Sequence, residues 1–276
     1  MRHIDQRFIK DLLCGELQYF FEKVKSNRDT LSLEVRDGYI NIYYKGGNLL
    51  RIRQQKTKYT FEFDAQYCKN KENDANFSLL NDRGSHDAEA YKQHFDLMMQ
   101  EMTSWFVAHP KPERDYQQEL LVNNPEIIDI EYQIGKRMRL DMLYVAENKL
   151  FIVENKFGNG AIGGKAGMSK HYQDICDLLN DSKTREEVLD SVCHISQAKK
   201  ALGLTDTAIE KNDIKGIEIL FLMANYIPKG KALSNELAKM NGTVPASILM
   251  ISGDQVKIDL SQAESILEFK SRLEKV

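Results

Sequence analysis

Two acidic residues and a lysine stand in a stretch of sequence that otherwise has the pattern of buried β-structure. The stretch is LDMLYVAENKLFIVENK, residues 140–156, and the residues in it that could do chemistry are Asp141, Glu154 and Lys156. Carboxylate oxygens are ligands that Mg²⁺ prefers, and a lysine can neutralise charge that develops on a phosphate. These residue types therefore suit metal-assisted chemistry on a phosphate, provided that the fold brings them together.

The same stretch predicts a β-hairpin that would bring the two acids together. Its turn is centred on Glu147 and Asn148, and asparagine tolerates the left-handed backbone that a tight hairpin turn needs. In that register Asp141 lies directly opposite Glu154, with roughly 5 Å between their Cβ atoms. Lys156 is two residues beyond Glu154 and therefore points to the same face of the sheet.

Apolar residues fill both faces of this predicted hairpin, so we expect both faces to be covered. Burial raises the pKa of a carboxyl group, and like charges placed opposite one another destabilise a sheet. Asp141 and Glu154 therefore need a remedy: either one of them holds a proton, or a cation bridges them. A hard divalent cation such as Mg²⁺ suits the second remedy.

A purely structural interpretation of these residues stays open. Glu154 and Lys156 would then form a solvated strand end, and Asp141 would pair with Arg137 or Arg139. An isolated pattern of this kind is common by chance. The opposed register and the two apolar faces favour the functional interpretation, in which Lys136 and the two arginines are candidates for phosphate contact.

The apolar patterns along the chain predict an α/β protein with two domains. The first, residues 1–84, would hold a helix at 5–25 and an antiparallel meander of about four strands. The second, residues 85–276, would begin with a long connecting helix at 86–108. Its further elements are predicted as helices at 113–123, 168–180 and 185–202, and as strands at 127–134, 138–146, 149–156, 216–226, 247–251 and 255–260.

These residues and their order of elements resemble the PD-(D/E)XK nuclease superfamily, which has the restriction-endonuclease-like fold. The core of that family runs helix, three-stranded antiparallel meander, helix, strand, as is predicted here from 113 to 224. Its second-strand acid matches Asp141, and its (D/E)XK triplet matches Glu154, Asn155 and Lys156. Leu140 stands where many members have proline. The resemblance implies such a core, whereas the smaller β-meander domain before it is predicted from the sequence pattern and resembles no module that we can name.

The resemblance also implies an enzyme, a metal-dependent endonuclease that hydrolyses phosphodiester bonds. Its cofactor would be Mg²⁺, with Mn²⁺ as a substitute, and its partner would be nucleic acid, with DNA favoured over RNA. Asp141, Glu154 and the backbone carbonyl of Asn155 would hold the metal. Lys156 would orient or activate the attacking water and stabilise developing charge.

Two further positions match residues that parts of the family use. Glu119, in the helix at 113–123, matches a glutamate that serves as an outer or second metal ligand. Gln173, in the helix at 168–180, matches a glutamine that several branches place near the metal. Cutting of both strands would favour a homodimer.

The composition restricts the alternatives. The net charge is −3, so nucleic-acid binding would depend on a local patch. The sequence has no run of eighteen apolar residues, so we expect no membrane span. The four cysteines are widely spread, which is typical of reduced thiols in a cytoplasmic protein. The glycine-rich loop at 157–167 lacks the spacing of a phosphate-binding NTPase loop. The alternative function is an inactive nuclease-fold protein that binds nucleic acid or another protein.

Overall fold

The computed structural model describes residues 1–68, 85–134, 138–164, 167–227, 231–252 and 255–273. The chain divides into two compact units, one of residues 1–118 with 194–208 and one of residues 119–193 with residues from 209 onward. Two of the three boundaries fall within helices, α6 (Pro112–Asn123) and α8 (Ser182–Ala201), and the third follows residue 208. The long helical region before residue 109 therefore belongs to the first unit.

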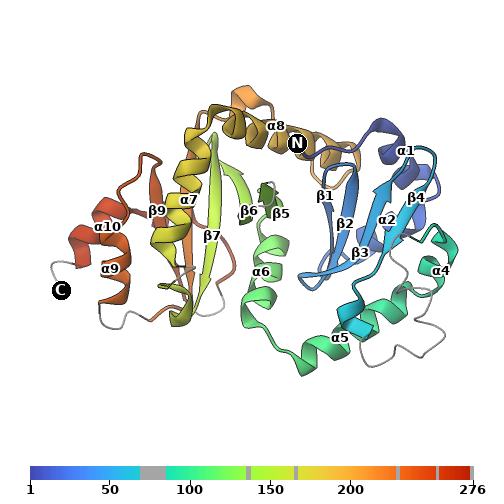
Figure 1. The fold of residues 1–276 in the computed structure, drawn as a ribbon, viewed down its shortest axis with the longest axis horizontal. Coiled ribbons are helices and arrows are strands. Elements are labelled where there is room, and N and C mark those ends of the chain that lie inside the picture. The colour runs from blue at the N-terminus through green and yellow to red at the C-terminus, as the bar shows by residue number, and fades with distance from the viewer. Residues whose placement is uncertain (69–84, 135–137, 165–166, 228–230, 253–254, 274–276) are drawn as a thin grey trace. The chain divides into compact units, whose positions relative to one another are not determined.

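The described residues of the first unit form a four-stranded antiparallel sheet in the order β1-β2-β3-β4 (Figure 1). Apolar and polar residues alternate along its strands, so that Leu33, Ile42 and Ile52 point to one buried face of the sheet. Gly46, with φ of 75°, supplies the left-handed backbone of the turn between β2 and β3. The strands are β1 (Leu31–Val35), β2 (Tyr39–Tyr44), β3 (Gly47–Gln54) and β4 (Tyr59–Glu62).

Two helices that the sequence predicts as continuous are each broken into two. Extended backbone at Gly15 separates α1 from α2, and a turn at His94 separates α4 from α5. Nδ1 of His94 lies 2.7 Å from the carbonyl oxygen of Ala90, a local side-chain hydrogen bond of the kind that competes with a regular helix. The four helices are α1 (Gln6–Cys14), α2 (Gln18–Ser26), α4 (Ala88–Gln93) and α5 (Phe95–Ala108).

The described residues of the second unit form a six-stranded mixed sheet in the order β10-β9-β8-β7-β6-β5. Strands β5, β6 and β7 are an antiparallel meander, β8 is parallel to β7 and β9, and β10 is antiparallel to β9. The predicted α/β class is confirmed. The strands are β5 (Ile127–Ile134), β6 (Met138–Ala146), β7 (Lys149–Phe157), β8 (Gly216–Ala224), β9 (Ala246–Ile251) and β10 (Glu264–Ser265), and the remaining helices are α7 (Met168–Asn180), α9 (Ala232–Ala238) and α10 (Ile266–Leu273).

The prediction of a strand at 255–260 is wrong, since the last strand, β10, comes after that segment. The carboxylate of Asp259 accepts hydrogen bonds from the backbone nitrogen of Ser261 at 3.1 Å and from its hydroxyl at 2.6 Å. These bonds favour the short helical turn at 260–262 over an extended strand.

The part of the chain that the structure describes contains no helix both long and apolar enough to span a membrane. All four cysteines lie in this part, and none of them forms a disulfide.

The turn between β6 and β7 offers a test of the fold. Glu147 and Asn148 have φ values of 50° and 59°, and the left-handed conformation costs glutamate more than it costs asparagine. We expect Glu147→Gly to raise the free energy of unfolding by about 0.5–1 kcal/mol, measured by urea denaturation. Asn148→Gly is the matched control and should change it less. A loss of stability in Glu147→Gly would contradict this turn geometry.

Candidate active site

The β6–β7 hairpin has the register that the sequence predicts. Pairing runs from Ala146 with Lys149 to Met142 with Val153, so Asp141 and Glu154 occupy the next opposed positions. Beyond the last pair, Oδ2 of Asp141 accepts a hydrogen bond of 2.9 Å from the backbone nitrogen of Asn155. The Asp141 carboxylate therefore lies against β7, at the residue that follows Glu154.

The carboxylate of Glu154 is fully buried, and its two oxygens have different surroundings. Oε2 lies 3.3 Å from Nζ of Lys156 and 2.5 Å from Nδ1 of His171. Among the described residues Oε1 has no hydrogen-bond partner, and it has no contact with solvent. One oxygen of the buried acid thus contacts two basic side chains, whereas the other has no partner among the described residues.

The position of these groups in the sheet explains why they are buried. Strand β7 lies between β6 and β8, and Glu154 and Lys156 are paired with Phe221 and Met223 of β8. Glu154 is 0% exposed and Lys156 is 5% exposed. Lone charges at such a place are prohibitively costly, so the two side chains need each other.

His171 lies at the acidic residues although it is not among the predicted site residues. The predicted bounds of helix α7 agree with the structure, but Gln173 is exposed and its amide donates to Oδ1 of Asp177 at 2.7 Å. A separation of two residues on a helix corresponds to a rotation of about 200°, so the side chains of His171 and Gln173 point to opposite faces of α7. The structure brings His171 to Glu154 and leaves Gln173 at the surface.

Two other candidates lie at the surface. Glu119 is exposed on α6, between the buried residues Gln118 and Leu120, and its carbonyl oxygen accepts a hydrogen bond of 2.8 Å from the side-chain amide of Asn123. Arg139 is 64% exposed and lies 3.3 Å from Glu131. The other candidates for phosphate contact, Lys136 and Arg137, lie outside the described residues.

Asn155 is also buried, and within the described part of the chain neither atom of its side-chain amide has a partner. Strand alternation points this side chain to the face opposite that of Glu154. Asn155 therefore presents only its backbone on the side of the sheet that carries Glu154.

Helix α7 is held by contacts on several sides. The hydroxyl of Tyr172 donates to the carbonyl oxygen of Val244 at 3.0 Å, and burial raises its pKa to about 12, so it stays neutral at physiological pH. The backbone nitrogen and the hydroxyl of Ser169 both donate to Oε2 of the buried residue Glu236, at 3.1 and 2.6 Å. These contacts fix the helix that carries His171.

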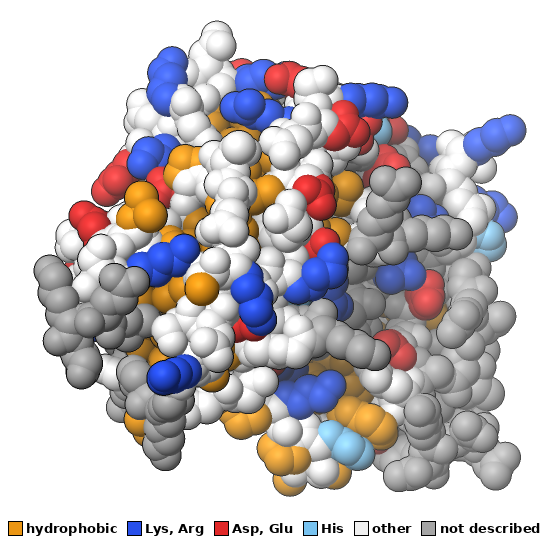
Figure 2. Space-filling model, turned by 60° about the vertical axis from the view of Figure 1, so that its left-hand side comes forward, with side chains coloured by type: hydrophobic (Ala, Val, Ile, Leu, Met, Phe, Trp, Pro, Cys, Tyr) orange, Lys and Arg blue, Asp and Glu red, His pale blue; other side chains and the backbone are white. Residues whose placement is uncertain are grey.

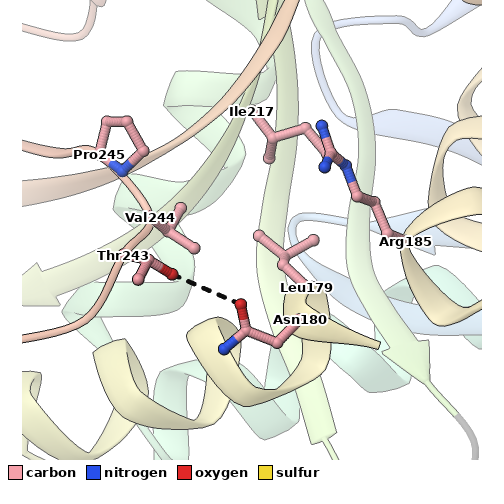
Figure 3. Close-up of a pocket in the computed structure, with 7 residues that line it drawn as sticks. All are labelled: Leu179, Asn180, Arg185, Ile217, Thr243, Val244 and Pro245. Carbon is pink, nitrogen blue, oxygen red and sulfur yellow. Dashed lines mark hydrogen bonds between the residues drawn. The ribbon is translucent and has the colours of Figure 1, made fainter. Parts of the chain in front are cut away.

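A small pocket of about 180 Å³ lies elsewhere in the second unit (Figure 3). It is formed by the end of α7, the start of α8 and the start of β8, where Ile217 is four residues before Phe221, the partner of Glu154. Four residues of strand span roughly 13 Å, so the pocket is separate from the acidic residues. Its lining residues are Leu179, Asn180, Arg185, Ile217, Thr243, Val244 and Pro245.

Comparison with known proteins adds little to this geometry. No protein-family model matches the chain, and no curated protein sequence matches it. One similar solved structure is that of Pyrococcus furiosus SfsA in complex with Ca²⁺, with 14% sequence identity over 86% of this chain and 88% of that chain, and a TM-score of 0.22. At that TM-score the similarity supports neither a shared fold nor a shared activity.

The burial of Glu154 predicts strong energetic coupling with Lys156. We expect Lys156→Met to lower the free energy of unfolding by about 3 kcal/mol, because it removes one partner of a buried charge. Adding Glu154→Gln should recover at least about 1 kcal/mol, since the neutral amide needs no counter-charge. Urea denaturation of the four proteins in this double-mutant cycle measures the coupling.

Lys149→Met is the matched control on the same strand. Lys149 is 46% exposed and lies 3.0 Å from Glu218, so its loss should cost less than about 1 kcal/mol. Additive effects of Lys156→Met and Glu154→Gln would show that the two groups are not coupled.

Proposed function

We propose that this protein is a Mg²⁺-dependent nuclease of the PD-(D/E)XK type that hydrolyses phosphodiester bonds. The observation that carries the proposal is the buried Oε1 of Glu154, which has no partner in the described ranges of the chain and lies beside the strand position of Asp141. A buried carboxylate oxygen without a partner is costly, and a bound cation would remove that cost. Lys156 and His171 occupy only the other oxygen.

The order of elements supports the proposal. Helix α6, the meander β5-β6-β7, helix α7 and strand β8 come in the order of the restriction-endonuclease-like core, with the additional helix α8 between α7 and β8. Asp141 is on the second strand of the meander, and Glu154, Asn155 and Lys156 are on the third. This arrangement is the one in which the family places its acid and its (D/E)XK triplet.

The residues present fit a Mg²⁺ ion. Within the described part of the chain no three His, Cys, Asp or Glu side chains form a cluster that could hold a metal ion by themselves. Mg²⁺ is commonly held by one or two carboxylates, with water and substrate phosphate completing its shell, so Asp141 and Glu154 suffice. The backbone carbonyl of Asn155 would be a further ligand. The ion would lower the pKa of a bound water and brace the phosphate.

The remaining chemistry belongs to side chains around the acidic residues. The ammonium of Lys156 lies beside the Glu154 carboxylate, where it can orient a water molecule and offset negative charge that develops on the phosphate. His171, hydrogen-bonded to the same oxygen, holds the carboxylate in one orientation. A charged group that is dry and fixed needs little reorganisation when the reaction occurs.

The proposed substrate is nucleic acid, with DNA favoured over RNA. Basic and acidic side chains are interspersed over the face that Figure 2 shows, so phosphate binding would depend on single cations near the acidic residues. Cutting of both strands would need two copies of the site, which favours a homodimer.

A second function is supported by a specific observation. Glu154 already has two partners, Lys156 and His171, as a purely structural buried ion pair would have. Glu119 and Gln173, which the family resemblance would place near the metal, are both exposed. The alternative is a nuclease-fold protein that binds nucleic acid or a protein partner without cutting.

Cleavage of plasmid and single-stranded DNA, with Mg²⁺ or Mn²⁺ and with a chelator, distinguishes the two functions. We expect metal-dependent cutting that falls at least about 100-fold in Asp141→Asn and in Glu154→Gln, because each removes charge from the metal site. Asp177→Asn is the matched control, since it neutralises an exposed acid on α7. Absence of metal-dependent cutting by the wild-type protein, or equal cutting by all variants, would contradict the nuclease proposal.

A further inference from the structure

Helix α7 begins without a cap of its own. Gly167 occupies the N-cap position and provides no side-chain hydrogen bond, and the first turn has no acidic residue. The first backbone N–H groups of a helix need partners, and the positive end of the helix favours a negative charge. Something outside the helix must therefore satisfy this end.

Glu236, from helix α9, supplies the missing cap. Its Oε2 accepts hydrogen bonds from both the backbone nitrogen and the hydroxyl of Ser169, while its Oε1 accepts one of 2.7 Å from Nζ of Lys239. Burial opposes ionisation of this carboxyl, but the hydrogen bonds from Lys239 and Ser169 outweigh burial and lower its pKa. A buried, charged carboxylate thus binds the start of α7.

The loop before α7 fits closely around this carboxylate. A Cβ atom at Gly167 would lie 2.9 Å from Oε2 of Glu236 and equally close to the backbone carbon of Gly163. Such a distance is shorter than real Cβ atoms tolerate, so the glycine permits the approach. The start of α7 is therefore placed by a tight contact, and Ser169 has little room to shift.

His171 lies in the same first turn, two residues after Ser169, and its backbone nitrogen donates to the carbonyl oxygen of Gly167 at 3.1 Å. Its ring reaches Oε2 of Glu154 on β7 at 2.5 Å. This hydrogen bond links the first turn of α7 to the buried carboxylate on β7. A change at the start of α7 therefore acts directly on the Glu154 carboxylate.

We propose that Glu236 is a positioning residue: by capping α7 through Ser169, it holds His171 against Oε2 of Glu154 and so directs Oε1 toward the metal. The inference rests on the proposed function only in its last step, which concerns the metal. The first step, that Glu236 places His171, is a statement about the metal-free protein and is tested separately.

The test compares Glu236→Ala with Glu268→Ala. Glu268 makes the same pair of hydrogen bonds at the start of α10, from the backbone nitrogen and the hydroxyl of Ser265, so its loss removes a similar cap elsewhere in the second unit. We expect the ¹⁵N and proton NMR signals of the His171 ring in metal-free protein to move toward those of an exposed histidine in Glu236→Ala. They should stay in place in Glu268→Ala, and Glu236→Gln should lie between the two.

Binding of Mn²⁺ alone, followed by calorimetry, tests the second step. Affinity should fall about tenfold in Glu236→Ala and stay unchanged in Glu268→Ala, because partners of metal ligands commonly have effects of this size. An unchanged His171 signal in Glu236→Ala would overturn the proposal. A moved signal in a protein whose Mn²⁺ binding does not depend on Glu154 would leave the positioning role intact and overturn the nuclease function instead.

Discussion

One buried carboxylate sets the requirements that the surrounding residues of the second unit meet. Glu154 is enclosed in a central strand, where an isolated charge would be prohibitively costly. Lys156 provides a positive charge from the same strand, and His171 provides a hydrogen bond from α7. The apolar residues on both faces exclude the water that would otherwise solvate these groups.

Replacing such a group by an apolar residue is often neutral or stabilising in other proteins, so stability alone is a weak reason to keep it. The unequal surroundings of its two oxygens are more informative. A carboxylate kept only for stability would be expected to use both oxygens, whereas Oε1 has no partner among the described residues. The proposed metal site accounts for this difference, whereas an ion pair that only supports the sheet does not.

The parts of the structure set by local sequence were predictable. Strands β5 and β6 have the predicted bounds and β7 extends one residue further, because alternation and the turn at Glu147 and Asn148 fix them over a few residues. The opposed positions of Asp141 and Glu154 follow from that turn. The breaks at Gly15 and His94 were missed, since the apolar period continues through both of them.

The rest of the site depends on contacts that a single sequence does not reveal. His171 is 17 residues from Glu154, and Glu236 is 67 residues from Ser169. Helical phase could have shown that His171 and Gln173 face opposite ways, but not which of them faces β7. Gly167 at the N-cap position of α7 has no side chain to cap the helix, which indicates a partner from elsewhere in the chain. Nothing in the local sequence identifies Glu236 as that partner.

A crystal soaked in Mn²⁺ tests the central claim most directly. We predict anomalous density beside Oε1 of Glu154, at about 2.0–2.3 Å, within reach of the Asp141 carboxylate. Lys156 and His171 should keep their contacts with Oε2. Absence of such density, with Oε1 hydrogen-bonded to water or to a protein group instead, would contradict that claim.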